Sequence, residues 1–327
     1  MKSVVFDEFG SPGKVLRIEE RPMPEAGPGQ VRVRMLLSPI HNHDLMIVTG
    51  HYGYKPPLPH VPGTEALGIV DKLGEGVGNL KVGQRVTGGA SAAWADYYVA
   101  NARALAPLPD GIDDGTACQL VSMPVSAFRL LIELEVKPGD WIVQNAANGA
   151  VGKMLARLAA EKGIRVLNLV RRDEAIAELA ADGIGDTIST ANHDWRDRAR
   201  ALTGGAPIIR ALDSIGGRAS DDLMDLVAEE GWLISFGALS GRPLQVSPEN
   251  LLFKQAIVKG FWAAKPSRIV TPEQIRGAIG DFIRRAAAGT LKLPIAEVYD
   301  LADAAKAAEA HNETGRPGKI ALRGSAA

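Results

Sequence analysis

The chain reads Asn145-Ala146-Ala147-Asn148-Gly149-Ala150-Val151-Gly152 between an apolar segment at 141–144 and an amphipathic segment at 150–162. A strand, a tight turn and a helix start in this order form a pyrophosphate site, because the helix N-terminus presents unpaired N–H groups and a partial positive charge. Gly149 would let the backbone approach the phosphates, and Gly152 would let the helix pack closely on the strand. The full fingerprint is G-x-G-x-x-G, and Ala147 stands at its first glycine. The stretch predicts a dinucleotide-binding turn.

Apolar and amphipathic segments alternate on both sides of this turn. The expected strands are 141–144, 164–170, 187–189, 208–213, 232–236 and 257–261, and the expected helices are 150–162, 174–181, 195–202, 219–228 and 248–255. Strands that alternate with helices in this way indicate an α/β fold built on a doubly wound parallel sheet.

The segments outside this region have a different pattern. Short strands are expected at 31–37, 68–74 and 85–89, a helix through 128–134, further helices at 272–288 and 301–313, and a last strand at 319–322. We therefore predict a nucleotide domain at 119–262, inserted between the two parts of a mostly-β domain at 1–118 and 263–327. A cleft between two such domains would hold the substrate.

The residues after the second strand of the nucleotide domain select the cofactor. NAD sites place an acid about 20 residues beyond the glycines, whereas this chain has Arg171-Arg172-Asp173. Two guanidinium groups suit a 2′-phosphate, because each donates hydrogen bonds in a planar fork. The sequence predicts NADPH. In the alternative, Asp173 holds the ribose, one arginine is a solvated surface charge, and the cofactor is NAD.

Charge and composition exclude several classes of protein. The formal net charge is −1, which argues against a polyanion binder and predicts no nucleic-acid partner. Cys118 is the one cysteine, so an intrachain disulfide is excluded. The sequence shows neither a signal peptide nor an apolar run of about 18 residues. We expect a soluble cytoplasmic enzyme with a small-molecule substrate and no membrane partner.

Several motifs resemble the zinc-free 2-enoyl thioester reductases and quinone oxidoreductases of the medium-chain dehydrogenase/reductase superfamily. The matching segments are the glycine–tyrosine loop at 50–53, the turn at 145–152, the arginine segment at 169–173, the strand and loop at 231–239, and the pair 252–254 and 260–262. The resemblance covers nearly the whole chain. It implies a Rossmann doubly wound sheet inserted in a mostly-β, GroES-like catalytic domain.

The resemblance also implies a reaction. NADPH would give a hydride to the β-carbon of an α,β-unsaturated thioester, and the α-carbon would take a proton. Tyr52 resembles the family's catalytic tyrosine. The residues that would contact the cofactor are Asn148, Gly149, Ala150, Val151, Gly152, Arg171, Arg172, Asp173, Phe236, Gly237, Ala238, Leu239, Phe261, Trp262, Ala263 and Lys319. Met123 stands where the family often has an asparagine near the nicotinamide.

Other interpretations remain open. The tyrosine hydroxyl is a donor that suits a developing enolate, but Tyr52 could instead only pack its loop. Trp262 could be an apolar plug at a domain junction. A quinone or alkenal reductase would use the same hydride chemistry, and a non-catalytic NADPH-binding protein would keep the fold without turnover.

The histidines of the N-terminal region raise the question of a metal. His41 stands near the first zinc-ligand position of the zinc alcohol dehydrogenases, but Thr64 occupies the place of the second ligand. A catalytic zinc needs three protein ligands, so we predict no metal site. The resemblance also implies a homodimer, since family members usually pair through the last strand of the nucleotide sheet. The apolar residues 256–258 are compatible with such pairing, and they also suit a buried strand.

Overall fold

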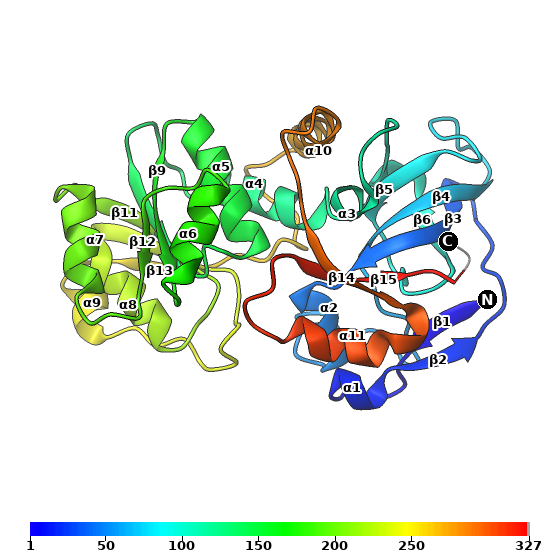
Figure 1. Cartoon of the computed structure of the whole chain (residues 1–327), viewed down its shortest axis with the longest axis horizontal. Helices are drawn as coiled ribbons and strands as arrows, with labels where there is room; N and C mark the ends of the chain where they lie inside the picture. Colours follow the sequence, from blue (N-terminus) through cyan, green and yellow to red (C-terminus); the bar gives the residue numbers. More distant parts are fainter. Residues whose placement is uncertain (326–327) are drawn as a thin grey trace. The chain divides into compact units, whose positions relative to one another are not determined.

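The structure is a computed structural model, which describes residues 1–325. Its contacts divide the chain into two compact units. Unit 1 contains Met1–Ser122 and the described residues from Arg276 onward, and unit 2 contains Met123–Ile275. Unit 2 carries the dinucleotide turn, and unit 1 carries Tyr52. Figure 1 follows the chain through both units, in colours from blue at the N-terminus to red at the C-terminus.

The second boundary between the units lies further along the chain than the predicted position after 262. Residues 263–275 group with unit 2. The physical reason is Arg129 of α4 (Ser122–Glu133), whose guanidinium donates to the carbonyl oxygens of Ala263 and Lys265. These bonds tie the segment after the last strand of unit 2 to a helix of the same unit.

Unit 2 is built on a six-stranded sheet whose strand order is β10-β9-β8-β11-β12-β13. The strands are β8 (Trp141–Gln144), β9 (Arg165–Val170), β10 (Thr187–Ser189), β11 (Ile208–Asp213), β12 (Val227–Ser235) and β13 (Ile257–Gly260). All neighbouring pairs are parallel. The order is that of a dinucleotide-binding Rossmann sheet, so the predicted doubly wound fold is confirmed.

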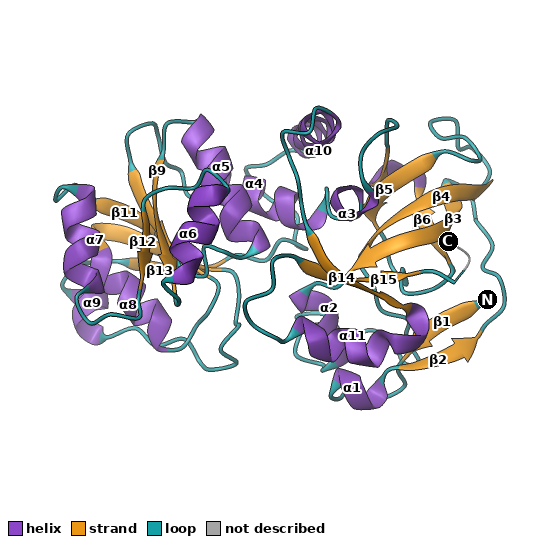
Figure 2. Cartoon of the chain, viewed as in Figure 1, coloured by secondary structure: helices purple, strands orange, loops and turns teal. Residues whose placement is uncertain are grey.

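Helices cover both faces of this sheet (Figure 2). They are α5 (Ala150–Glu161), α6 (Glu174–Ala181), α7 (Trp195–Thr203), α8 (Arg218–Leu226) and α9 (Pro248–Leu252). α5 and α6 lie on one side and α7 and α8 on the other. Because helices cover both faces, all four residues of β8 are buried, as the apolar central strand of a parallel sheet requires.

β12 begins earlier than the sequence indicates, at Val227 rather than at residue 232. The pairing of β11 with β12 shifts register between the Ile208 and Arg210 pairs, which marks a bulge. Glu230 has a φ of +57° within this strand. The residues that follow α8 therefore enter the sheet directly, in a locally irregular strand.

Unit 1 is mostly β, with a seven-stranded sheet. The strand order is β14-β15-β3-β4-β5-β7, and β6 also pairs with β3. The strands are β3 (Gln30–Pro39), β4 (Glu65–Leu73), β5 (Arg85–Gly89), β6 (Tyr97–Asn101), β7 (Leu105–Pro107), β14 (Ile295–Asp300) and β15 (Lys319–Arg323). A separate hairpin joins β1 (Lys2–Val5) to β2 (Arg17–Glu20). The predicted GroES-like domain, completed by the returning C-terminal strands, agrees with this arrangement.

Unit 1 also contains several short helices. They are α1 (Pro12–Val15), α2 (Asn42–Val48), α3 (Asp114–Ala117) and α11 (Ala304–His311), with 3₁₀ turns at Ala102–Ala104 and Leu301–Asp303. The longer α10 (Pro272–Ala287) crosses the second boundary between the units. Within the described residues, no helix has the length and apolar character that would let it cross a bilayer, and the cytoplasmic location stays a prediction.

Candidate functional site

The predicted pyrophosphate turn connects β8 to α5. Asn148 and Gly149 are exposed, and Gly149 caps α5 with a φ of −74° and a ψ of 164°. The first N–H groups of this helix have no partner within it, which leaves donors for an anion. The left-handed residue of the turn is Ala146, with a φ of +47°, and not Ala147 at the first fingerprint position. The structure therefore has the predicted strand–turn–helix junction although the first glycine is missing, and phosphate binding by this turn stays a prediction.

Gly152 is needed because α5 packs closely on its own turn. A Cβ at Gly152 would lie 2.7 Å from the carbonyl oxygen of Ala147 and 2.8 Å from its Cα. Gln144, the last residue of β8, donates from Nε2 to the carbonyl oxygen of Gly152 at 2.9 Å. The close approach of helix and strand that the sequence predicts is present in the structure.

A buried carboxylate holds the turn in place. Asp213 ends β11 and is fully buried. Its Oδ1 accepts from Asn145 Nδ2 at 2.7 Å and from the backbone N–H groups of Ile215 and Gly216, and its Oδ2 accepts from Ser220 Oγ at 2.6 Å. Asp213 therefore fixes the loops after β8 and β11 to each other. We did not predict this role, although an acid at the end of an apolar strand was visible in the sequence.

The predicted cofactor residues of unit 2 lie where strands end. Asn148, Gly149, Ala150, Val151 and Gly152 follow β8, Arg171, Arg172 and Asp173 follow β9, Phe236, Gly237, Ala238 and Leu239 follow β12, and Phe261, Trp262 and Ala263 follow β13. Parallel strands end at one edge of a sheet, which is where α/β proteins bind ligands. Contact of each residue with a cofactor stays a prediction.

The loop after β12 approaches the loop after β11 closely. A Cβ at Gly237 would lie 2.6 Å from the carbonyl oxygen of Ser214 and 3.0 Å from its Cα. A side chain at Gly237 would push these two loops apart. The close packing of these two loops therefore requires glycine at position 237, whether or not a ligand binds.

The two arginines after β9 differ in their surroundings. Arg172 forms ion pairs with Glu178 at 3.1 Å and with Glu174 at 3.6 Å. Arg171 is exposed, and no ion pair links it to another of the described residues. We predicted that both arginines bind one phosphate, but only Arg172 is paired with carboxylates among the described residues of the protein. Arg171 is the one whose charge is not already neutralised by a carboxylate.

Tyr52 lies in the loop after α2 and is half-buried against the core of unit 1. Its ring is 5.9 Å from the ring of His43, at an interplanar angle of 34°. His43 in turn stacks on His41, with ring centroids 5.0 Å apart. His43 Nε2 lies 2.6 Å from Thr64 Oγ1, and that hydroxyl donates to Asp44 Oδ1 at 2.7 Å. Tyr52 is thus the outer member of a polar cluster that we did not predict.

The inner part of this cluster is a buried histidine–carboxylate pair. His41 Nε2 lies 2.8 Å from Glu65 Oε2, and neither side chain is exposed. Glu65 Oε1 also accepts from the backbone N–H groups of Val121 and Ser122. Burial raises the pKa of Glu65 to about 7 and lowers the pKa of His41 well below its ordinary value. The pair carries less charge than the same side chains would in water.

Lys319 belongs to β15 of unit 1, close to this pair. Its Nζ lies 3.4 Å from the carbonyl oxygen of Ile40, and burial lowers the pKa of Lys319 to about 8. The attraction of Glu65 opposes that shift. The contact of Lys319 with a cofactor, which the resemblance implies, stays a prediction.

The residues of unit 1 do not fit a catalytic zinc ion. Such a site needs three protein ligands from cysteine, histidine and carboxylate side chains. Across residues 1–325, no three of these side chains come together in a way that could hold a metal ion. The facing atoms of His41 and Glu65 bond to each other, and the buried Cys118 Sγ donates to the carbonyl oxygen of Gly115.

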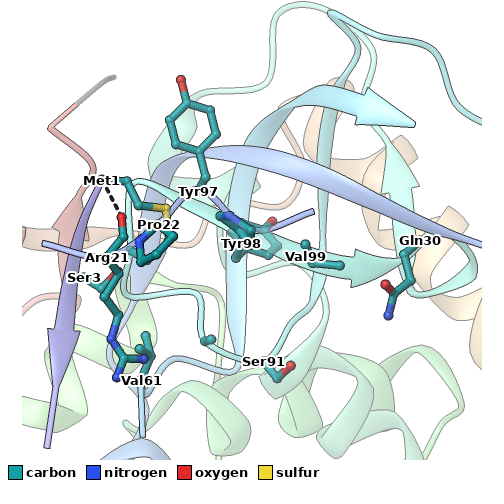
Figure 3. A pocket seen from close by; sticks show the side chains of 13 residues that line it. Met1, Ser3, Arg21, Pro22, Gln30, Val61, Ser91, Tyr97, Tyr98 and Val99 are labelled. Atoms are coloured by element: carbon teal, nitrogen blue, oxygen red, sulfur yellow. Dashed lines mark hydrogen bonds between the residues drawn. The ribbon is translucent and has the colours of Figure 1, made fainter. Parts of the chain in front are cut away.

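A surface pocket of about 600 Å³ lies elsewhere in unit 1 (Figure 3). Its lining includes Ser3, Arg21, Gln30, Tyr97 and Tyr98. No residue that we predicted for catalysis or for the cofactor lines it. The pocket therefore adds nothing to the candidate site.

Comparisons with known proteins agree with this geometry. Residues 27–128 match the family model of the alcohol dehydrogenase GroES-like domain, and residues 150–279 match that of the zinc-binding dehydrogenases. The first match covers the mostly-β unit from residue 27 and ends a few residues inside unit 2, and the second match begins in the dinucleotide turn.

Individual relatives cover almost the whole chain. The mitochondrial enoyl-[acyl-carrier-protein] reductase of Homo sapiens is 30% identical over 320 residues, which is 95% of this chain and 85% of that protein. The structure of Escherichia coli quinone oxidoreductase complexed with NADPH superposes with a TM-score of 0.86 at 27% identity, covering 99% of this chain and 100% of that one. The quinone oxidoreductase of Pseudomonas syringae pv. Tomato DC3000 gives a TM-score of 0.85 at 28% identity, covering 98% and 99%. The chain therefore belongs to the medium-chain dehydrogenase/reductase superfamily, in the zinc-free branch of the enoyl reductases and quinone oxidoreductases.

Proposed function

We propose that this protein is an NADPH-dependent reductase of activated carbon–carbon double bonds, with a 2-enoyl thioester as its acceptor. The observation that carries the proposal is the similarity to a mitochondrial enoyl-[acyl-carrier-protein] reductase along nearly the full length of both chains. The position of Tyr52 in the glycine–tyrosine loop of unit 1 supports the same acceptor.

The cofactor is NADPH, and it supplies the hydride when bound. The donors at the start of α5 suit its pyrophosphate, and Arg171 suits its 2′-phosphate. Asp213 and Asn145 keep the pyrophosphate turn in shape before the cofactor arrives. The site is thus preorganised by bonds within the protein.

Tyr52 is the residue that we assign to the reacting part of the acceptor. Hydride addition at the β-carbon leaves an enolate, whose negative charge is greatest after that transfer. A hydroxyl that donates to this charge lowers the barrier, because it binds the transition state more strongly than the substrate. Tyr52 then gives its proton to the α-carbon.

Quinone reduction is the second candidate. It is favoured by the similarity to the quinone oxidoreductases of Escherichia coli and Pseudomonas syringae, which superpose along nearly the whole chain. A quinone and an enal are also electrophilic conjugated carbonyl compounds, so they make similar demands on the site. A protein that binds NADPH without turnover is the third candidate, from a different class.

Loss of NADPH absorbance with three acceptors separates these candidates. The purified protein is mixed with NADPH and a crotonyl thioester of coenzyme A, a quinone or a short enal. We expect the highest kcat/KM with the thioester. A higher kcat/KM with the quinone or the enal would show that this compound, and not the thioester, is the preferred acceptor. NADPH binding without oxidation by any of the three acceptors would favour a non-catalytic binding protein.

Arg171→Ala is expected to weaken NADPH binding about 10- to 100-fold, since a charge-assisted hydrogen bond contributes about 1.5–3 kcal/mol. NADH binding should change little, because NADH lacks the 2′-phosphate. Arg172→Ala should have the smaller effect, since Glu178 already pairs with Arg172. Calorimetric titration with both dinucleotides measures the difference, with Arg198→Ala on the exposed face of α7 as the control. Equal losses for NADPH and NADH would contradict the assignment.

We also propose a homodimer that forms through the edge of the unit 2 sheet. β13 is the last strand in the order, and the apolar side chains of Leu252, Phe253 and Ile257 are 65%, 78% and 47% exposed. Light scattering after size exclusion should give twice the chain mass, and Ile257→Lys should give the monomer. Val82→Lys changes an apolar residue of unit 1 that is 63% exposed, and it should leave the dimer intact. A monomeric wild type would refute the dimer.

A further inference from the structure

His43 is held in one tautomer by its neighbours. Thr64 has a single hydroxyl hydrogen, which it donates to Asp44 Oδ1 at 2.7 Å. The Thr64 oxygen must therefore accept from His43 Nε2, which lies 2.6 Å away. The same carboxylate lies 3.7 Å from His43 Nε2. Nδ1 is left as the ring nitrogen that can take up and release a proton.

Asp44 is itself fixed. Its side chain is fully buried at the start of α2, and its Oδ2 accepts from the backbone N–H of His41 at 2.9 Å. The hydrogen bonds from Asp44 through Thr64 to His43 therefore start at a carboxylate that is itself held in position. Such an arrangement orients the imidazole of His43, in the way a carboxylate orients a catalytic histidine.

His43 also lies between the interior and Tyr52. One face of its ring stacks on His41, and Tyr52 lies 5.9 Å away. His41 has no exposed surface and its Nε2 is bonded to Glu65, so it has no route to solvent. The His43 side chain is 23% exposed. Of the two histidines, only His43 can exchange a proton with water next to Tyr52.

We propose that His43 is a proton relay between solvent and Tyr52, an inference that rests on the proposed reductase function. NADPH, when bound, would supply a hydride that forms the new C–H bond at the β-carbon, and the double-bond electrons would move to the thioester oxygen. The α-carbon then takes the proton of the Tyr52 hydroxyl. The His43 imidazolium returns a proton to the Tyr52 phenolate, and neutral His43 takes one from water.

Two substitutions test the relay. His43→Gln keeps an N–H donor for Thr64 but cannot transfer a proton at neutral pH. We expect kcat with a crotonyl thioester to fall about 10- to 100-fold, within the range of general acid–base effects. NADPH affinity should change by less than about twofold, since His43 belongs to unit 1 and the predicted phosphate contacts belong to unit 2.

His43→Ala opens space for an added imidazole. Imidazole in the buffer should restore much of the lost kcat in this variant, which a purely structural role of His43 would not allow. His193→Ala, at an exposed position of unit 2, is the matched control and should show neither loss nor rescue. A His43→Gln variant with wild-type kcat, or a folded His43→Ala variant that imidazole does not rescue, would overturn the relay.

Failure of the relay and failure of the proposed function are distinguishable. If the wild type binds NADPH but oxidises it with no acceptor, the reductase function itself is refuted. If the wild type turns over and both His43 variants behave as it does, only the relay is refuted. Circular dichroism and NADPH titration of each variant establish that it is folded before its kcat is compared.

Discussion

Tyr52→Phe is expected to lower kcat for a crotonyl thioester about 100-fold, in the range found when one proton donor to a developing oxyanion is removed. The phenylalanine ring keeps the packing of Tyr52 against the core of unit 1, so the fold should be unaffected. The hydroxyl is the only group lost. Because it acts after hydride transfer begins, its removal should change kcat and leave the NADPH dissociation constant within about twofold.

Tyr54→Phe is the matched control for this experiment. Tyr54 lies two positions further along the same loop and is 53% exposed. It should keep the wild-type kcat, which would separate a role of the Tyr52 hydroxyl from any general sensitivity of the loop. Steady-state rates and fluorescence titration with NADPH provide both measurements. A Tyr52→Phe enzyme with wild-type kcat at saturating thioester would remove Tyr52 from the mechanism.

Gly152→Ala is expected to lower the free energy of unfolding by about 1–3 kcal/mol, the usual cost of overpacking. At an exposed position in a helix the same substitution would stabilise by up to about 1 kcal/mol. The sign reverses here because the new Cβ would meet the backbone of Ala147 at 2.7–2.8 Å, and backbone atoms cannot rotate away. α5 must shift outward, which also moves the phosphate donors at its N-terminus. NADPH affinity should therefore fall at least about tenfold.

Urea unfolding and calorimetric titration measure these two effects of Gly152→Ala. Gly185→Ala is the matched control, because a Cβ at Gly185 meets no atom within 4 Å and the residue is exposed. That variant should keep both the stability and the NADPH affinity of the wild type. If Gly152→Ala were more stable than the wild type, the close packing of α5 on the turn would be refuted.

Periodicity predicted unit 2 well because its strands and helices are regular and end at clear breaks. β8, β10 and β11 have the predicted bounds, and α6 does as well. In unit 1 the pattern was less informative. β14, for example, was missed because most of its residues are exposed. Its sequence therefore lacks the alternation of apolar and polar residues that marks a half-buried strand. An exposed strand that returns to a distant part of the chain has no strong local signal.

The candidate site divides in the same way. The glycines, the arginines and Tyr52 were found from local motifs. Asp213 was missed because its partner Asn145 lies far away in sequence. The same holds for Thr64, which meets His43 only because the chain just before β4 comes close to the start of α2.

By itself the sequence determined the alternation of strands and helices, the turn at 145–152 and the acid-or-arginine choice after β9. These features follow from residues within one turn or one period of each other, so neighbours along the chain are enough to specify them. Only the tertiary structure decided that Arg172 forms an ion pair with Glu178 while Arg171 forms none with the described residues. It also decided that Thr64 and Asp44 orient His43 beside Tyr52. Hydrogen bonds and ring contacts act over a few ångströms in space, so they depend on the side-chain positions that the folded chain sets, and Thr64 meets His43 only when distant parts of unit 1 come together.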